Sequence, residues 1–162
     1  MSHDNLLIRN LTWLEIDAMD HELALKVKQD QYEPDVIIGL VRGGMIPAVH
    51  LSHLLKVRLT YPLWVKRTES DDAYSNRIQP LIKGGEYLGD IQAKRILVVD
   101  EVTNSGETLE AVKDYLWKVD PLEIKTATLV WNSKIAPEGM VKPPSNYNVH
   151  ITEVWVNFPW ES

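Results

Sequence analysis

Two adjacent carboxylates and the short polar turn after them form the part of the sequence best suited to chemistry. Asp100 and Glu101 follow the predicted strand 95–99, and the turn opens a segment with helical spacing. Free N–H groups and the positive dipole end of a helix N-terminus bind phosphate, and the hydroxyls of Ser105 and Thr108 add donors. Carboxylates repel phosphate but bind sugar hydroxyls or a metal ion beside it. The pattern predicts a ligand with a ribose and a phosphate; a capped helix with solvated acids is the alternative.

A second segment suited to anions follows another apolar run. Arg42, Gly43 and Gly44 come directly after residues 36–41. A guanidinium group binds anions through several hydrogen bonds, and glycines let the backbone approach a ligand closely. If this turn faces the first, the two together suit a molecule with phosphates at both ends. A tight strand-to-helix turn would use the same residues without binding anything.

Alternating helical and strand patterns must position these two turns. Thr12 and Glu15 have the spacing of a capping box, and apolar residues then follow at helical intervals, which predicts a helix near 12–30. Further elements are predicted as helices over 46–55 and 106–119 and as strands over 36–41, 58–65, 95–99, 124–131 and 149–156. This order predicts an α/β fold, a Rossmann-like parallel sheet flanked by helices, with ligands at the carboxyl ends of the strands.

Residues 66–91 interrupt this alternation with a polar stretch that holds one Pro and three Gly. A connection of this length is uncommon in a compact domain unless it has a function. We therefore predict a flexible functional loop, with room for a hairpin inside it. No repeat or linker divides the chain, so residues 1–162 are predicted to form a single domain.

Composition excludes several classes of protein. The 162 residues include no cysteine, which removes disulfides, thiolate nucleophiles and thiolate metal sites, and fits a cytoplasmic protein. The formal net charge of -6 argues against a nucleic acid partner, since nucleic-acid-binding domains are usually basic. No apolar run approaches the ~20 residues of a membrane span, so no membrane partner is expected.

Three motifs resemble those of the type I phosphoribosyltransferases and occur in the same order along the chain. ILVVDEVTNSGETL resembles the family's signature for 5-phosphoribosyl-1-pyrophosphate (PRPP), and VIIGLVRGGMIPAV resembles its pyrophosphate loop. WVNFPWE resembles the hood that covers the base in 6-oxopurine phosphoribosyltransferases of bacteria and archaea. The likeness spans nearly the whole chain and is closest to archaeal hypoxanthine/guanine and bacterial xanthine-guanine enzymes. It implies the type I phosphoribosyltransferase fold, with hood elements in residues 132–162.

The resemblance implies how PRPP is held. Asp100 and Glu101 would bind the ribose hydroxyls and, with Glu161, place Mg²⁺ as the cofactor. The loop within 66–91 would close over PRPP, and the peptide bond between Val41 and Arg42 would be cis. Further contacts are implied to the 5′-phosphate from Ser105, Gly106, Glu107 and Thr108, and to the pyrophosphate from Arg42, Gly43 and Gly44.

On the base side, the resemblance implies that Trp155 stacks on the purine and that Val156 gives it backbone hydrogen bonds. Two positions depart from the family's pattern. Asn104 stands where relatives carry an Asp that handles the N7 proton, and an amide cannot act as a base. Asn132 stands where they carry a Lys for the 6-oxo group. Lys134 lies two residues on, which in a continuing strand is the same side but ~6–7 Å away.

Taken together, the residues and the resemblance favour an enzyme that transfers phosphoribose from PRPP to a purine base, most simply a 6-oxopurine. Assembly as a homodimer or homotetramer is also implied. The alternative is a non-catalytic regulator of the same fold that senses PRPP or a nucleotide, a possibility raised by Asn104 and Asn132. An unrelated doubly wound nucleotide-binding domain would leave the VRGG and WVNFPWE motifs unexplained.

His50 and His53, three residues apart on a predicted helix, are the remaining candidates for metal ligands. A protein metal site needs at least a third ligand, and the sequence around them supplies none. No metal site is therefore predicted there.

Overall fold

The computed structural model describes residues 7–68 and 77–162, and a six-stranded sheet forms its centre. The strands are β2 (Val36–Val41), β3 (Leu59–Thr68), β4 (Arg77–Lys83), β5 (Arg95–Thr103), β6 (Glu123–Asn132) and β7 (Tyr147–Thr152). They lie in the order β4-β3-β2-β5-β6-β7, and every neighbouring pair is parallel except β3 and β4. The predicted α/β class and parallel sheet are confirmed.

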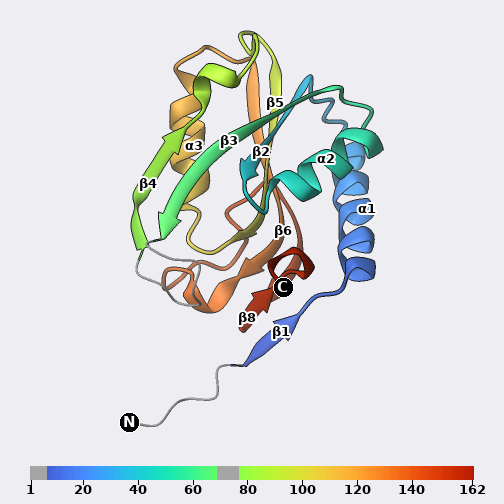
Figure 1. Ribbon diagram of the computed structural model, residues 1–162, viewed down its shortest axis with the longest axis vertical. Helices are drawn as coiled ribbons and strands as arrows, with labels where there is room; N and C mark the ends of the chain where they lie inside the picture. Colours follow the sequence, from blue (N-terminus) through green and yellow to red (C-terminus); the bar gives the residue numbers. More distant parts are fainter. Residues whose placement is uncertain (1–6, 69–76) are drawn as a thin grey trace.

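Helices cover both faces of this sheet (Figure 1). α1 (Trp13–Gln29) and α2 (Met45–Leu54) lie on one face, and α3 (Glu107–Trp117) lies on the other. The Thr12–Glu15 capping box at the start of α1 is present as predicted. Within residues 7–68 and 77–162, none of the helices has the length and apolar character that crossing a membrane requires.

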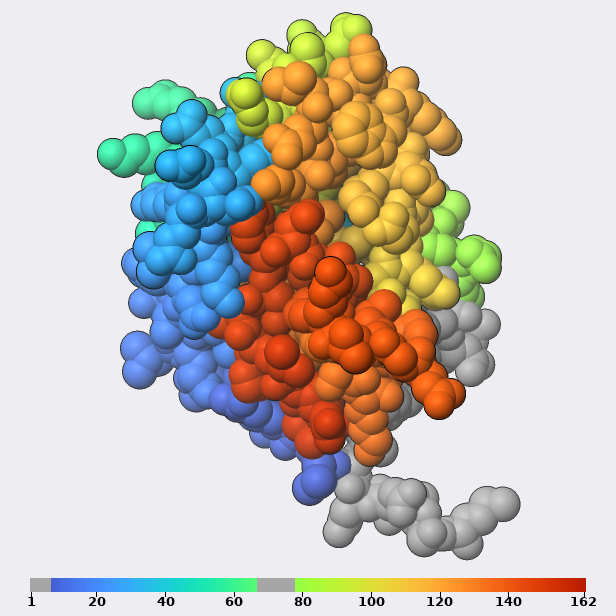
Figure 2. All heavy atoms as spheres, turned by 180° about the vertical axis from the view of Figure 1, so that it is seen from behind, coloured from blue at the N-terminus to red at the C-terminus, as the bar shows by residue number. Residues whose placement is uncertain are grey.

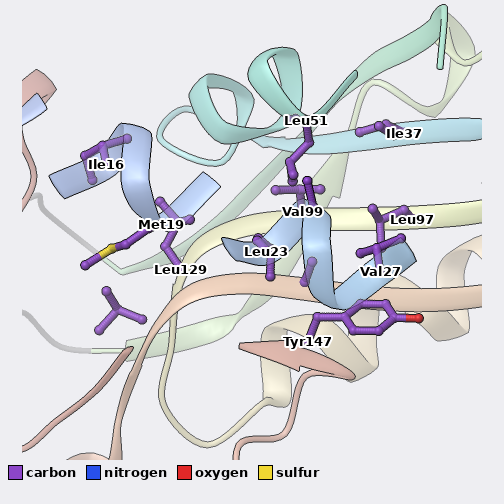
Figure 3. Close-up of a cluster of buried hydrophobic side chains, with 14 of the residues drawn as sticks. Ile16, Met19, Leu23, Val27, Ile37, Leu51, Leu97, Val99, Leu129 and Tyr147 are labelled. Atoms are coloured by element: carbon purple, nitrogen blue, oxygen red, sulfur yellow. The ribbon is translucent and has the colours of Figure 1, made fainter. Parts of the chain in front are cut away.

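The core explains why the central strands are apolar throughout. Alternate side chains of a strand point to opposite faces, and here both faces are covered. Ile38 and Val98 therefore pack on the α3 side. On the other face, shown in Figure 3, the strand residues Ile37, Leu97 and Val99 meet helix residues Leu23, Val27 and Leu51.

The C-terminal segment differs from the prediction, because the single expected strand 149–156 is two strands in two sheets. β7 joins the main sheet, whereas β8 (Trp155–Asn157) pairs in parallel with the unpredicted β1 (Ile8–Asn10). β1 and β8 form a separate two-stranded hood sheet. A strand of three residues is too short to show a sequence period, so tertiary pairing defines it.

The segment 66–91 is shorter as a loop than predicted. β3 continues to Thr68, and Arg77–Lys83 returns antiparallel to it as edge strand β4, so the hairpin is confirmed. A 3-10 turn, η1 (Gly85–Tyr87), then leads toward β5. Pro80 is tolerated in β4 because an edge strand leaves some of its N–H groups unpaired. Residues 69–76, the centre of the predicted flexible loop, lie outside the described residues.

Candidate active site

The candidate site lies at the carboxyl ends of β2 and β5, which are adjacent and parallel. From β2 the chain passes through α2 to β3 on one side, and from β5 through α3 to β6 on the other. Ligands bind at such a reversal of strand order, because the two outgoing connections part and leave a crevice. Figure 1 shows β1 and β8 at the end of the molecule toward which β3 runs, so the hood lies at this end.

The paired acids lie within the last part of β5 rather than after it, since the strand runs on to Thr103. Asp100 and Glu101 are half-buried, and the backbone N–H of Glu101 donates to Asp100 Oδ1 at 2.9 Å. Burial, and then the neighbouring Glu101 carboxylate, raise the pKa of Asp100 well above its usual range. The site therefore places two carboxyl groups next to each other where the ionised form of Asp100 is disfavoured.

The turn after β2 touches these acids. A Cβ added to Gly43 would lie 2.3 Å from Glu101 Oε1, so only a glycine permits the observed approach. At Gly44 the same atom would lie 2.6 Å from the carbonyl oxygen of Val99, which precedes the acids. The structure thus brings the two predicted turns together, and the Val41–Arg42 peptide bond is cis, as the resemblance implies.

Both helices that leave the site begin at a glycine. Gly44 is the N-cap of α2 and Gly106 is the N-cap of α3, so neither helix has a side-chain cap. Gly106 has a φ of +85°, which favours glycine, and a Cβ there would also meet Pro144 at 2.5 Å. Ser105 lies directly before this glycine, and its Oγ accepts a long hydrogen bond of 3.4 Å from the N–H of Glu107, the first residue of α3. This arrangement suits an anion such as a phosphate.

The amide of Asn132 is engaged by the protein itself. Its Nδ2 donates to the carbonyl oxygen of Val154 at 3.1 Å, and its Oδ1 accepts from the backbone N–H of Lys134 at 3.2 Å. The side chain is buried, so it ties the end of β6 to the turn before the hood. The strand ends at Asn132, and Lys134 is exposed in the 3-10 turn η2 (Ser133–Ile135). The expectation that Lys134 keeps the strand's side is therefore wrong.

Asn104 and the hood residue Trp155 are each held by a hydrogen bond within the protein. The half-buried Asn104 accepts a 3.0 Å hydrogen bond at its backbone carbonyl from the Trp131 indole, which holds the turn after β5 against β6. In the hood, the half-buried Trp155 donates its indole N–H to Asn157 Oδ1 at 3.0 Å, and Val156 is buried.

Contacts with the helical layer anchor the hood. Trp160, in the 3-10 turn η3 (Pro159–Glu161), stacks on Phe158 with ring centroids 4.8 Å apart and lies 5.8 Å from Trp13 of α1. The exposed Glu161 accepts a hydrogen bond from Phe158 N–H at 2.7 Å, so one of its oxygens stabilises this turn. Figure 2 shows the C-terminal part of the chain, orange to red, filling the rear face between α1 and α3.

The acid pair fits a magnesium ion. Mg²⁺ prefers oxygen ligands and is usually bound by one or two carboxylates together with substrate phosphates. Asp100 and Glu101 supply such oxygens, and a bound divalent cation would favour the ionised form of Asp100, which burial and Glu101 disfavour. The metal role of Glu161 stays a prediction.

Comparison with known proteins agrees with this geometry. The profile of the phosphoribosyl transferase domain family matches residues 13–161. A xanthine-guanine phosphoribosyltransferase of Cereibacter sphaeroides is 29% identical over 163 residues, which cover 94% of this chain and 86% of that protein. A hypoxanthine phosphoribosyltransferase of Haemophilus influenzae is 22% identical over 155 residues, covering 96% and 79%.

Solved structures give the same result. A purine phosphoribosyltransferase from Pyrococcus horikoshii superposes with a TM-score of 0.74 at 37% identity, covering 96% of this chain and 94% of that one. A Neisseria gonorrhoeae protein with bound ppGpp superposes with a TM-score of 0.78 at 25% identity, covering 99% and 92%.

Proposed function

The chain belongs to the phosphoribosyl transferase family, and from this premise we propose that it transfers phosphoribose from PRPP to a purine base. The products would be a nucleoside 5′-monophosphate and pyrophosphate. The observation that carries the proposal is the contact between the acids of β5 and the glycine turn after β2, beside two helix N-termini. That arrangement would supply two anion sites beside the carboxylates.

Each part of PRPP has a matching part of this site. Asp100 and Glu101 would accept hydrogen bonds from the ribose 2′- and 3′-hydroxyls. The 5′-phosphate would lie at the start of α3, and the pyrophosphate would lie at the turn after β2. The residues proposed for these two anion sites are Ser105, Gly106, Glu107 and Thr108 for the first, and Arg42, Gly43 and Gly44 for the second.

The reaction needs positioning more than covalent help. Loss of pyrophosphate from the anomeric carbon develops oxocarbenium character, as in glycoside cleavage, and the base nitrogen attacks that carbon. Asp100 and Glu101 would hold the metal, and Mg²⁺ when bound neutralises charge on the departing pyrophosphate. The ribose hydroxyls and the two anion sites would fix the sugar in line with the base. The loop within 66–91 would exclude water, since hydrolysis of PRPP competes with transfer.

For the base, we propose a 6-oxopurine, in agreement with the names of the similar bacterial proteins. Trp155 would stack on the ring, and backbone groups at Val156 would bind its edge. Lys134 is the exposed cation nearest in sequence to the end of β6 and is the candidate for the 6-oxo group. Asn132 is better suited to positioning the hood, because both ends of its amide contact backbone.

A second candidate is a regulator of the same fold that binds PRPP or a nucleotide without catalysis. Asn104 favours it, because an amide at this position cannot take the proton that relatives give to a carboxylate. The ligand of the Neisseria gonorrhoeae protein, ppGpp, is itself a phosphorylated nucleotide.

The deciding experiment is an assay with PRPP and Mg²⁺ against hypoxanthine, guanine, xanthine, adenine, uracil and orotate. Release of pyrophosphate with one or more 6-oxopurines is the expected result. Turnover of only adenine or a pyrimidine would refute the choice of base. PRPP binding without turnover of any base would instead favour the regulator. Sedimentation of the same sample tests the implied homodimer or homotetramer.

Replacing Gly43 by Ala is expected to weaken PRPP binding with little change in thermal stability. The new methyl group would displace the Glu101 carboxylate, which is the flexible end of a side chain. Weakening one hydrogen bond to a charged group costs about 1.5–3 kcal/mol, or about 10–10²-fold in affinity. Calorimetry with PRPP and a melting curve measure the two effects.

Gly44→Ala is the matched contrast, because its methyl group would meet the carbonyl oxygens of Leu40 and Val99 at 2.7 and 2.6 Å. Backbone cannot yield as a side chain does, so this variant should lower the melting temperature. Equal stability loss in the two variants would contradict the contact between Gly43 and Glu101.

Trp155→Ala is expected to weaken purine or nucleotide binding by ~10–100-fold, since stacking on a base contributes ~1–3 kcal/mol. PRPP binding should stay nearly unchanged, because the hood covers the base side only. Calorimetry with each ligand separates the two effects. Trp117→Ala, which truncates a half-exposed Trp at the far end of α3, is the control. Equal losses for purine and PRPP would argue against a base-specific role.

A further inference from the structure

A cluster of metal-binding side chains lies on the outer surface where α1 and α2 pack together, apart from the acids of β5. It consists of Asp17 and His21, one turn apart on α1, and His50 on α2. One ligand atom from each lies within 4.8 Å of the others. Asp17 Oδ1 is 3.6 Å from His21 Nδ1 and 3.8 Å from His50 Nε2, and the two imidazole rings meet edge to face.

We propose that Asp17, His21 and His50 bind a zinc-class divalent transition metal ion. Zinc lies about 2.0–2.2 Å from nitrogen and oxygen ligands, which places neighbouring ligands about 3.3–3.6 Å apart in a tetrahedron. The observed separation between Asp17 Oδ1 and His50 Nε2, 3.8 Å, exceeds this range only slightly. Asp17 and His21 have side chains 57% exposed, so they can close around an ion without disturbing the core.

The buried Asp20 gives this cluster the support that metal-binding histidines usually have. Asp20 is only 1% exposed, and its Oδ2 lies 2.8 Å from His50 Nδ1. When Nδ1–H donates to this carboxylate, the lone pair is on Nε2, the nitrogen that faces Asp17. A buried carboxylate that fixes a histidine tautomer in this way raises the ligand's basicity and orients the ring. Its second oxygen, Oδ1, is buried with no hydrogen-bond partner in the described part of the chain.

The contacts of His21 are compatible with ligation. Its Nδ1 lies 2.9 Å from the backbone carbonyl oxygen of Asp17, which can only accept, so Nδ1 carries the proton and the lone pair that could bind an ion is on Nε2. Ligands at i and i+4 share one face of a helix, and the third ligand comes from the neighbouring helix. A bound ion would therefore cross-link α1 to α2, the helix that begins at Gly44 in the candidate active site.

The donor set selects the class of ion. Two imidazoles and one carboxylate suit zinc, cobalt, nickel or copper, whereas magnesium and calcium prefer oxygen ligands alone. Three protein ligands on an exposed surface also leave a position for water or an additional ligand. This site is thus chemically distinct from the acid pair of the candidate active site, and it does not depend on the proposed transferase activity.

Calorimetry with Zn²⁺ tests the proposal, using the full chain without a histidine tag, treated with chelator and held in excess Mg²⁺. We expect one ion per chain, with affinity at least about 10–100-fold weaker in His21→Ala and in His50→Gln, the scale known for supporting residues of metal sites. His53→Ala is the matched control, because this exposed histidine of α2 lies outside the cluster. The double variant Asp100→Asn/Glu101→Gln should bind zinc as the unaltered chain does.

Two further measurements keep the test independent of folding defects. Co²⁺ in place of zinc should give visible d–d absorption bands that His21→Ala abolishes, and Zn²⁺ should raise the melting temperature only while the cluster is intact. Circular dichroism of the exposed-site variant His21→Ala checks that it folds. Absence of zinc binding to the unaltered chain would overturn the proposal. Zinc binding that persists in both histidine variants would also overturn it. The same holds for zinc binding that is lost in the double variant Asp100→Asn/Glu101→Gln.

Discussion

Replacing Asp100 by Asn and Glu101 by Gln together is expected to abolish measurable PRPP binding. Hydrogen bonds to charged groups contribute about 1.5–3 kcal/mol each, so losing two corresponds to about 10²–10⁴-fold in affinity. The amides also lose the negative charge with which the pair would hold Mg²⁺ beside the pyrophosphate. Calorimetry of PRPP in the presence of Mg²⁺ measures the effect.

The same double variant should fold, and its ligand-free form should melt at an equal or higher temperature. Burial and Glu101 raise the pKa of Asp100, so ionising this group at neutral pH opposes folding. Removing the charge removes that cost. Glu110→Gln is the matched control, since Glu110 is exposed on α3 and pairs only with Lys113 among the described ion pairs. Unchanged PRPP affinity in a folded double variant would exclude the proposed role.

Asn104→Asp is expected to raise the rate of phosphoribosyl transfer to a 6-oxopurine. A positioned general base contributes about 10²–10⁴-fold, and the amide of Asn104 cannot accept the proton from purine N7. The backbone carbonyl of Asn104 accepts from the Trp131 indole, a contact that does not depend on the side chain, so the turn should keep its place. Steady-state kinetics with hypoxanthine and guanine, and PRPP affinity measured in parallel, test this expectation.

Asn146→Asp is the matched control for that substitution. Asn146 Oδ1 accepts hydrogen bonds from Thr126, which a carboxylate would preserve, and it lies toward the amino end of β6. If the unaltered chain already turns over a 6-oxopurine rapidly and Asn104→Asp slows it, then Asn104 is not a handicap. If neither form uses a purine while both bind PRPP, the regulator becomes the better assignment.

Much of the fold was predictable because local sequence carries the signal wherever both faces of an element are buried. The runs 36–41 and 96–99 are apolar without alternation, since helices cover both sides of β2 and β5. The capping box of α1 is likewise local, because it joins residues three apart in the chain.

The carboxylate pair and the glycine turn were predictable for a related reason. Both follow or end a buried parallel strand, and parallel strands present their carboxyl ends at one edge of the sheet. Sequence spacing therefore placed Asp100, Glu101 and Gly43 at a common edge. It did not reveal that Gly43 lies against the Glu101 carboxylate, which depends on the adjacency of β2 and β5.

Other features depend on residues far apart in the chain, and there the sequence alone was insufficient. β1 and β8 pair across almost the full length of the chain, and three residues are too few to show a period. Asn132 suggested a base contact by its place in the motif. In the structure β6 stops at Asn132, and the amide of this residue hydrogen-bonds to the backbone of Val154 and Lys134.

The histidines show most clearly the difference between what local sequence reveals and what depends on distant residues. From the sequence, His50 had only His53 as a neighbour at helical spacing, and a pair does not make a metal site. In the folded chain His50 faces Asp17, His21 and the buried Asp20 of another helix, while His53 lies outside the cluster. Sequence by itself determined the buried strands, the cap and the chemistry at the sheet edge, because each is encoded within a few neighbouring residues. Only tertiary structure decided the hood pairing, the engagement of Asn132 and the partners of His50, because packing between distant segments creates them.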